Sequence, residues 1–215
     1  MKKILSIFLL FVSLICVNGC KCNSDVDFAF FKEKTNSIDG YKYYIVSQSI
    51  YNEELLLYKS DKNVYLDGEK EKILLTIKEI NGLENEELYT LSEEEYYRFD
   101  EDFYYKENNE WKIEKREVNE GLGISISRGL FEKYKITVKK GNKFFAGEIK
   151  QEALKEFLGF EIEDASNVIL NIEINSSNKV KNISLEYKTS NNNNVTISIK
   201  VGYSQVIKFK LPTVE

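Results

Sequence analysis

The fold of this chain is decided by the stretch "VILNIEINSSNKVKNISLEYKTSNNNNVTISIKVGY", residues 168–203. Every second residue from Val168 to Ile174 is apolar, and the same alternation returns from Val195 to Tyr203. A period of two is typical of strands that bury one face and leave the other in water. Polar connectors at 175–178 and 190–194 separate these runs, so strands that follow one another in sequence should pair in one antiparallel sheet.

The flanking sequence extends this sheet in both directions. A hairpin is predicted from Tyr134–Val138 and Phe144–Ile149, which a glycine-containing turn joins. Between that hairpin and the opening stretch, apolar residues at helical spacing predict a helix over Gln151–Gly159. Beyond the stretch, Val206–Leu211 is predicted to be one more strand, followed by Pro212 where the sheet needs no further amide donor.

The first half of the chain repeats the pattern in shorter runs. A helix is predicted over Phe28–Ile38, with Asp25 or Asp27 as its N-cap. After Gly40, β-branched and aromatic residues alternate with polar ones between turns such as Asp67-Gly68. We expect strands near 41–45, 55–57, 64–66 and 73–77, a hairpin turning at Glu101 within 84–106, a strand at Trp111–Lys115, and a loop with a short helix over 118–131.

These elements predict a mainly β (α+β) fold: a curved antiparallel sheet, or incomplete β-barrel, covered by two or three short helices. Of the 215 residues, 42% are hydrophobic and 30% are charged, which is enough apolar material for a core. Cysteine does not occur after residue 22, so no disulfide framework can stabilise the domain. Its stability must come from packing and from sheet hydrogen bonds.

The amino-terminal segment predicts export. Two lysines precede an almost unbroken apolar run, Ile4–Val17, which is shorter than the about 20 residues that a membrane-spanning helix needs. A basic start, a short apolar run and a small residue at its exit make a secretory signal. Val17-Asn18-Gly19-Cys20 resembles the bacterial lipobox, in which a lipoprotein signal peptidase cuts before a cysteine that carries diacylglycerol.

The lipobox resemblance implies an address for the protein. Residues 1–19 would be the signal peptide, 20–27 a short tether, and 28–215 a single β-rich domain. Acyl chains such as palmitate on Cys20 would anchor the exported protein to the outer face of the cell membrane, or to the outer membrane if the host has one. The alternative is ordinary cleavage after Gly19, which would leave Cys20 and Cys22 as thiols or as a close-set disulfide.

The order of elements also resembles a known family. An exported chain with an early helix, a long antiparallel meander, a helix before the last four strands and the closing segment "VIKFKLP", residues 206–212, is similar to the lipoprotein-carrier superfold of LolA-like and LppX-like proteins. The resemblance covers about Phe28 to Pro212 and lies in the pattern of elements. It implies a strongly curved, incomplete barrel that helices close, with acyl chains held between them. It carries over no single ligand-contacting residue.

A sheet with one apolar face and little helix to cover it predicts a groove wide enough for hydrocarbon. The ligand-binding residues that we expect are Leu170, Ile172, Ile197 and Ile199 on the apolar face, and Trp111. The expected function is that of a non-catalytic, membrane-anchored lipoprotein that binds a hydrophobic or lipidic ligand, or the lipid moiety of another protein. The alternative is that side chains fill the space completely, which would leave a surface or envelope lipoprotein that binds a protein or a glycan.

The composition argues against several other functions. Histidine is absent, which removes the commonest general base and the usual zinc ligand. Acidic residues fall in runs such as Glu93–Glu95, which are typical of solvated surface rather than of a catalytic carboxylate pair. We therefore expect no enzyme activity, no cofactor and no metal site. The formal net charge of −5 argues against a nucleic-acid partner.

The aromatic run from Tyr96 to Trp111 is a further feature that suggests recognition. Because acidic residues are interleaved with its rings, it would suit an exposed strip that binds a sugar or a protein partner. The alternative is an amphipathic pair of strands that buries half of these rings and exposes the other half.

Overall fold

The computed structural model describes residues 24–80, 88–117, 122–158, 165–204 and 207–214. Its helices are α2 (Ser24–Asn36), η1 (Arg128–Leu130), η2 (Gln151–Ala153) and α3 (Leu154–Leu158). The strands of the first half are β1 (Tyr43–Asn52), β2 (Leu55–Asp67), β3 (Lys70–Ile80), β4 (Leu88–Phe99), β5 (Asp102–Glu107) and β6 (Glu110–Lys115). Those of the second half are β7 (Phe131–Lys139), β8 (Asn142–Ile149), β9 (Ser166–Ile174), β10 (Val180–Lys188) and β11 (Asn193–Gly202).

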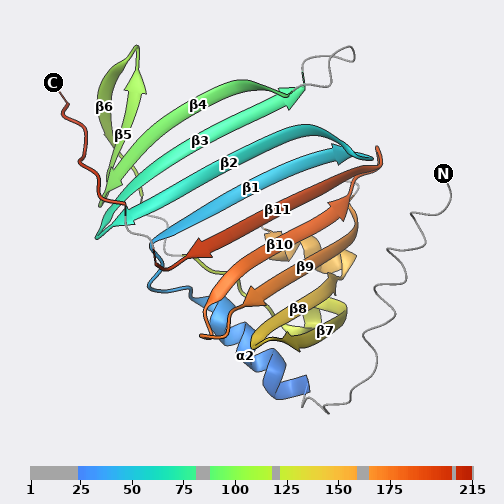
Figure 1. Cartoon of the computed structure of the whole chain (residues 1–215). Coiled ribbons are helices and arrows are strands. Elements are labelled where there is room, and N and C mark those ends of the chain that lie inside the picture. Colours follow the sequence, from blue (N-terminus) through green and yellow to red (C-terminus); the bar gives the residue numbers. More distant parts are fainter. Residues whose placement is uncertain (1–23, 81–87, 118–121, 159–164, 205–206, 215) are drawn as a thin grey trace.

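In this part of the chain, all eleven strands belong to one antiparallel sheet with the order β6-β5-β4-β3-β2-β1-β11-β10-β9-β8-β7. The sheet is curved and its edges do not meet (Figure 1). The chain steps outward from β1 to β6, then re-enters at the opposite edge and steps inward from β7 to β11. Pairing of β1 with β11, from Tyr43 with Gly202 to Asn52 with Asn193, joins the two halves. The predicted fold class is confirmed.

Several local predictions are also confirmed, but the two strands expected near 55–57 and 64–66 are one continuous strand, β2. The hairpin within 84–106 turns at Asp100-Glu101, between β4 and β5. The helix expected over Gln151–Gly159 is present as η2 followed by α3, and Gly159 lies outside the described residues. The loop over 118–131 contains η1 as its short helix, and its residues 118–121 also lie outside them.

The strand predicted over Val206–Leu211 is wrong, because residues 207–214 form no strand. β10 and β1 already pair with the two sides of β11, so no position beside β11 remains open to the tail. The tail instead reaches β4, where the ring of Phe209 lies 5.7 Å from that of Tyr97. Burial of an aromatic ring thus takes the place of a ladder of hydrogen bonds.

The start of the first helix also differs from the prediction. α2 begins at Ser24, so Asp25 and Asp27 lie inside the helix and neither is its N-cap. The helix therefore takes up the second half of the expected tether, 20–27, and four positions separate Cys20 from the first helical residue. Residues 20–23 of the expected tether lie outside the described residues.

The strand register assigns each residue to a face of the sheet, because directly paired residues of antiparallel strands point to the same side. We call the side on which α2 packs the helix face and the other side the outer face. One row of the helix face runs through Leu170, Leu185, Ile197, Gln48 and Ser60. Along this row the residues are apolar on β9 to β11 and polar on β1 and β2, and the next residue, Ile77 on β3, is apolar again.

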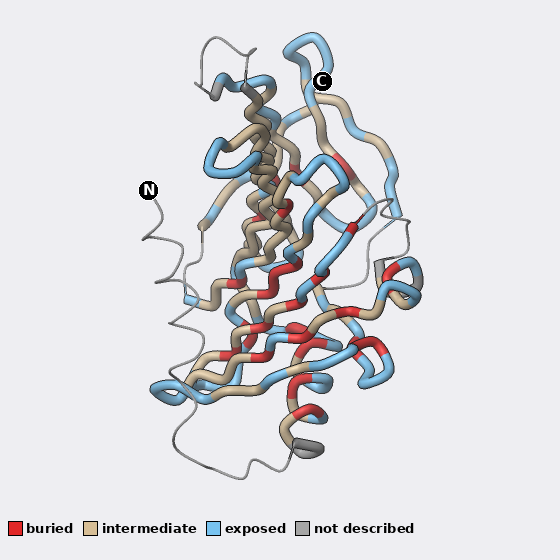
Figure 2. Tube along the Cα trace, turned by 90° about the vertical axis from the view of Figure 1, so that its right-hand side faces the viewer, coloured by how far each residue is buried: buried red, intermediate tan, exposed pale blue. Residues whose placement is uncertain are grey.

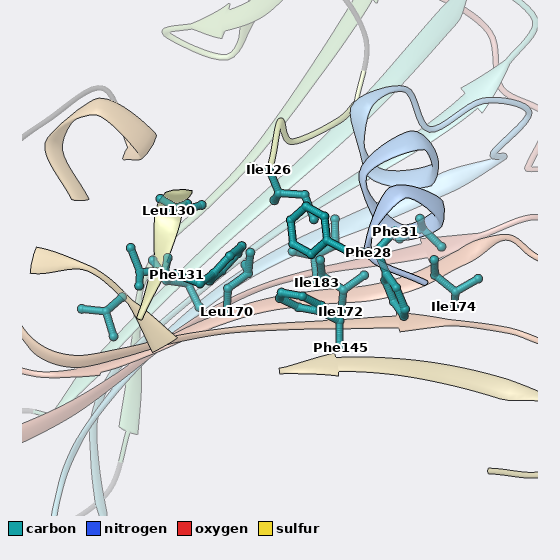
Figure 3. Packing of buried hydrophobic residues seen from close by; sticks show 14 of the residues in the cluster. Phe28, Phe31, Ile126, Leu130, Phe131, Phe145, Leu170, Ile172, Ile174 and Ile183 are labelled. Atoms are coloured by element: carbon teal, nitrogen blue, oxygen red, sulfur yellow. The ribbon is translucent and has the colours of Figure 1, made fainter. Parts of the chain in front are cut away.

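The main core lies between α2 and the helix face of β7–β11. Phe31 on α2 packs against Phe145 on β8 with ring centroids 5.6 Å apart, and Phe28 lies 5.9 Å from the same ring (Figure 3). The loop that carries Ile126 and Leu130 covers the rest of the cluster. Figure 2 shows that buried positions gather around this helix, while most strand positions farther away are intermediate or exposed.

Candidate ligand-binding face

The helix face of the first half of the sheet has no helix over it among the described residues (Figure 1). Apolar side chains that continue the core outward are therefore only partly buried there, although their residues point to the same side as the core. They are Ile197 and Ile199 on β11, Val46 on β1, and Leu75 and Ile77 on β3. A half-exposed apolar row that begins at a packed core is a surface suited to an apolar partner.

A second, smaller cluster lies on this uncovered face. Val64, Ile73 and Phe103 are buried in it, and the rings of three tyrosines pack around them: Tyr44, Tyr96 and Tyr105. The ring centroids of Tyr96 and Phe103 are 5.3 Å apart. Because these residues come from β1 to β5, the cluster ties the first half of the sheet together without a helix.

A hollow of about 440 Å³ opens beside this cluster, and we call it the tyrosine hollow. Its lining includes Tyr41, Tyr44, Glu71, Ile73, Arg98, Phe103 and Arg116. A guanidinium nitrogen of Arg98 lies 2.7 Å from a carboxylate oxygen of Glu71, and the two side chains are 18% and 14% exposed. The hollow thus combines aromatic walls with a largely buried ion pair.

A second hollow, of about 800 Å³, lies between β4 and the β5–β6 hairpin. It exists because β5 pairs with β4 only over Tyr97–Phe99, after which the hairpin diverges from the sheet. Leu75, Tyr96 and Tyr105 line it, as do the acidic residues of β4. Arg116 lines both hollows, and its guanidinium carbon lies 3.7 Å from the centroid of the Phe103 ring. The two hollows therefore adjoin.

The phenol of Tyr44 is perturbed by its place in the tyrosine hollow. Burial is the main cause that raises the pKa of Tyr44 from 10.0 to about 12, and the carboxylate of Glu71 raises it further. Burial, followed by Glu71, also raises the pKa of Tyr41. Both phenols therefore remain neutral donors for a ligand well above neutral pH.

This shift predicts a loss of stability at alkaline pH. Because the folded state raises the pKa of Tyr44, its contribution is complete below pH 10 and is lost as pH rises to about 12. We expect Tyr44→Phe, which cannot ionise, to show a shallower fall in the free energy of unfolding across that window, measured by denaturant titration. Glu71→Gln should make this fall smaller and end it at a lower pH, because the pKa of Tyr44 in the folded state is then raised less. An unchanged slope in Tyr44→Phe would contradict the assignment.

The residues expected to bind a ligand fall into three groups. Leu170 and Ile172 are each 2% exposed and lie inside the packed core, where they line neither hollow. Ile197 and Ile199 share their face but are half buried, at the border between core and open face. Trp111 is on the outer face, with its ring 5.5 Å from that of Tyr97. The structure thus brings the four aliphatic residues together and separates Trp111 from them.

The aromatic run 96–111 is divided by the two faces of the sheet. Tyr96 and Tyr105 join the cluster on the helix face, whereas Tyr97 and Trp111 contact each other on the outer face, where Tyr97 also meets Phe209 of the carboxy-terminal tail. Sequence reasoning did not single out Arg98 or the residues around it. The sequence feature that could have drawn attention to Arg98 is the rarity of arginine, which occurs only at 98, 116 and 128.

Two further findings concern chemistry and topology. Within the described ranges, no group of three or more histidine, cysteine or acidic side chains is arranged to hold a metal ion. Among the helices that the structure describes, none is both long enough and apolar enough to cross a membrane. Cys20 lies outside the described residues, so its anchor stays a prediction.

No family model matches this sequence, and no curated protein sequence matches it. Among solved structures, the chain is similar to the crystal structure of LprF from Mycobacterium bovis. The two are 13% identical, the TM-score is 0.39, and the match covers 79% of this chain and 90% of that one. A TM-score of this size is too low for any functional inference, so the fold described above rests on the strand order.

Proposed function

We propose that this protein is an exported, membrane-anchored lipoprotein whose helix face binds a hydrophobic or lipidic ligand, or the lipid moiety of another protein, without catalysis. One observation carries the proposal: the apolar surface of the core continues onto strands that no described helix covers. Burying such a surface contributes about 25 cal/mol for each Å² removed from water. A ligand that covers it would gain that stabilisation.

A second row of paired residues on the helix face, next to the one described above, shows how such a ligand would lie. Ile199 pairs with Val46, Val46 with Lys62, and Lys62 with Leu75, so these four side chains cross the strands on the helix face. Lys62 is exposed, and a lysine can lay its aliphatic stem along apolar surface while its ammonium stays in water. The row therefore suits an acyl chain that lies across the strands.

The tyrosine hollow would receive the polar end of the ligand. It adjoins the row, since Lys62 lines it as well. Neutral phenols can donate hydrogen bonds there, and the guanidinium groups of Arg98 and Arg116, which already pair with Glu71 and Glu114, have further N–H donors that fit a carboxylate or a phosphate. An amphipathic lipid matches this neighbouring pair of surfaces better than a plain hydrocarbon does.

The packed interior favours a second candidate function. Leu170 and Ile172 are enclosed by Phe31, Phe145 and their neighbours, so side chains of the described residues fill the space around them. A protein partner that covers the open helix face would satisfy the same apolar row. In that case the protein would act as an envelope interaction lipoprotein.

Lipid extraction separates the two candidates. The protein carrying Cys20→Ala, which removes covalent lipid, would be purified and extracted with organic solvent, and the extract analysed by mass spectrometry. We expect co-purified lipid from this protein and loss of most of it when Val46→Asp is added, because the charge would lie in the apolar row. Ile45→Asp is the matched control, since Ile45 is the neighbouring residue on the outer face of β1.

The outcomes of this experiment are distinct. Lipid that is lost with Val46→Asp and kept with Ile45→Asp supports the proposed binding face. Equal losses from both variants would place the ligand elsewhere. Extracts without lipid from the parent protein would reject lipid binding and leave the interaction lipoprotein.

A further inference from the structure

Charge is distributed unevenly along the sheet. The β7–β8 hairpin, residues 131–149, contains five lysines and two acidic residues. The segment from β3 to β6, residues 70–115, contains 14 acidic residues and seven basic ones. Since β7 is one edge of the sheet and β3 to β6 lie at the other end, the protein has a basic edge and a predominantly acidic opposite end, which we call the acidic edge. An overall charge of −5 conceals this asymmetry.

The basic charge is most concentrated where two turns meet. Lys139 and Lys140 are exposed at the β7–β8 turn, and the β9–β10 turn lies against it. The backbone amide of Ser176 donates to the side-chain oxygen of Asn142 at 3.1 Å, and Lys143 donates to Asn178 at 2.9 Å. These hydrogen bonds hold the two turns, and their lysines, as one surface.

An apolar side chain accompanies these lysines. Val138, the residue before Lys139, is 60% exposed, more than any other large hydrophobic side chain of the described residues. Val138 pairs with Lys143, so these two side chains share the helix face, whereas Lys139 points to the outer face. An exposed apolar side chain next to a lysine, at a turn that carries further lysines, is a combination found on surfaces that meet lipid headgroups. The basic edge is thus both cationic and able to insert an apolar group.

Edge protection alone does not explain the excess of lysine on this edge, which remains although Lys133 pairs with Glu148 at 2.7 Å. Lysines on edge strands prevent pairing with other sheets, and the opposite edge, β6, needs the same protection. There Lys112 pairs with Glu110 at 3.0 Å, and acidic and basic residues alternate along the strand. Mixed charge is therefore sufficient to protect an edge of this sheet, and the excess of lysine on β7 needs another cause.

The amino terminus of the structured domain lies at the basic edge. Phe28, in the second turn of α2, packs against Phe131 of β7 with ring centroids 6.2 Å apart, and Lys143 lies 3.8 Å from the ring centroid of Phe30. In Figure 1 the first turn of α2 lies at the β7 end of the sheet. Four residues of chain reach at most about 14 Å, so a lipid on Cys20 would hold this edge close to the bilayer.

We infer that the basic edge formed by β7 and the β7–β8 turn docks on an anionic phospholipid bilayer surface. The inference rests on the anchor that we propose at Cys20, which brings this edge, and not the acidic one, to the membrane. The lipid anchor would attach the domain at one point and the basic edge at a second. Two attachments would orient the domain, so that the sheet stands on its β7 edge. The tyrosine hollow, on β1 to β5, would then face away from the headgroups.

The acidic edge does not oppose this arrangement. Ten strand spacings of about 4.8 Å place β6 on the order of 48 Å from β7 along the sheet. The Debye length at physiological ionic strength is about 8 Å, so the bilayer would repel those carboxylates only weakly. The lysines within that length would dominate the interaction.

Vesicle sedimentation tests the inference without the anchor. The processed chain carrying Cys20→Ala would be mixed with vesicles of phosphatidylglycerol and phosphatidylcholine, and with vesicles of phosphatidylcholine alone. We expect binding to the anionic vesicles that weakens steeply with salt. Replacing Lys135, Lys139 and Lys140 with glutamine should lower the partition coefficient about tenfold or more, because each lysine near such a surface contributes measurably.

A triple variant elsewhere supplies the matched control. Lys115→Gln, Lys188→Gln and Lys210→Gln change the net charge equally but lie on other strands and in the tail, and they should leave the partition coefficient unchanged. The inference is overturned by absent binding, by equal binding to neutral vesicles, by equal loss in the control variant, or by duplex DNA binding as tightly as the anionic vesicles. None of these results would alter the lipid extraction, so the ligand proposal stands or falls separately.

Discussion

Replacing Cys20 with alanine is expected to abolish lipid labelling of the protein and to move it from the membrane fraction to the soluble fraction. The lipobox resemblance makes Cys20 the first residue of the mature chain and the site of its acyl chains. Each buried methylene contributes about 0.8 kcal/mol, so two or three chains hold a protein stably where one is marginal. Loss of all the acyl chains should therefore remove nearly all of the protein from the membrane fraction.

The measurement is incorporation of a palmitate analogue together with fractionation at high salt. The salt wash removes binding through the basic edge, so that only the covalent anchor is scored. Cys22→Ala is the matched control, because it removes the neighbouring thiol and leaves the lipobox intact. If label persisted in Cys20→Ala, or was lost only with Cys22→Ala, the anchor would be misassigned.

Replacing Phe31 with alanine is expected to destabilise the fold by about 3–5 kcal/mol, the usual cost of removing a buried aromatic ring. Phe31 is 0% exposed, and its ring packs 5.6 Å from that of Phe145 beneath α2. Alanine favours a helix, so the loss would come from the cavity and not from the helix itself. For a domain of this size, the melting temperature should fall by roughly 10 °C.

Phe30 provides the matched control on the same helix. Its side chain is only partly buried and lies over the ammonium of Lys143, so Phe30→Ala should cost clearly less than Phe31→Ala. Thermal and denaturant unfolding of both variants give the comparison. Equal losses would mean that α2 does not hold the core through Phe31, and that the main core is not organised as described.

The strands themselves were predictable because their cause is local. Alternation with a period of two, and turns such as Asp67-Gly68, act within a few residues, so the hairpins from β1 to β6 and from β7 to β11 follow from sequence. The one long-range pairing, β1 with β11, did not follow. Nothing local to Tyr43 distinguishes Gly202 as its partner.

Two errors have the same physical origin. Val206–Leu211 alternates as a strand should, yet β1 already occupies the place beside β11, and the tail packs Phe209 on Tyr97 instead. Asp25 and Asp27 suit an N-cap, yet the helix starts before them. Local preference is worth about 1 kcal/mol or less for each such choice, so tertiary packing overrides it.

The sequence by itself predicted export, and it determined that the chain forms an antiparallel sheet with one apolar side. Both depend on patterns that neighbouring residues carry. Only the tertiary structure decided which part of that side is core. Leu170 and Ile197 occupy equivalent positions in similar strands, but Leu170 is 2% exposed and Ile197 is half buried. The reason is the reach of one short helix: α2 packs over the β7 end of an eleven-stranded sheet, and burial ends where its contacts end.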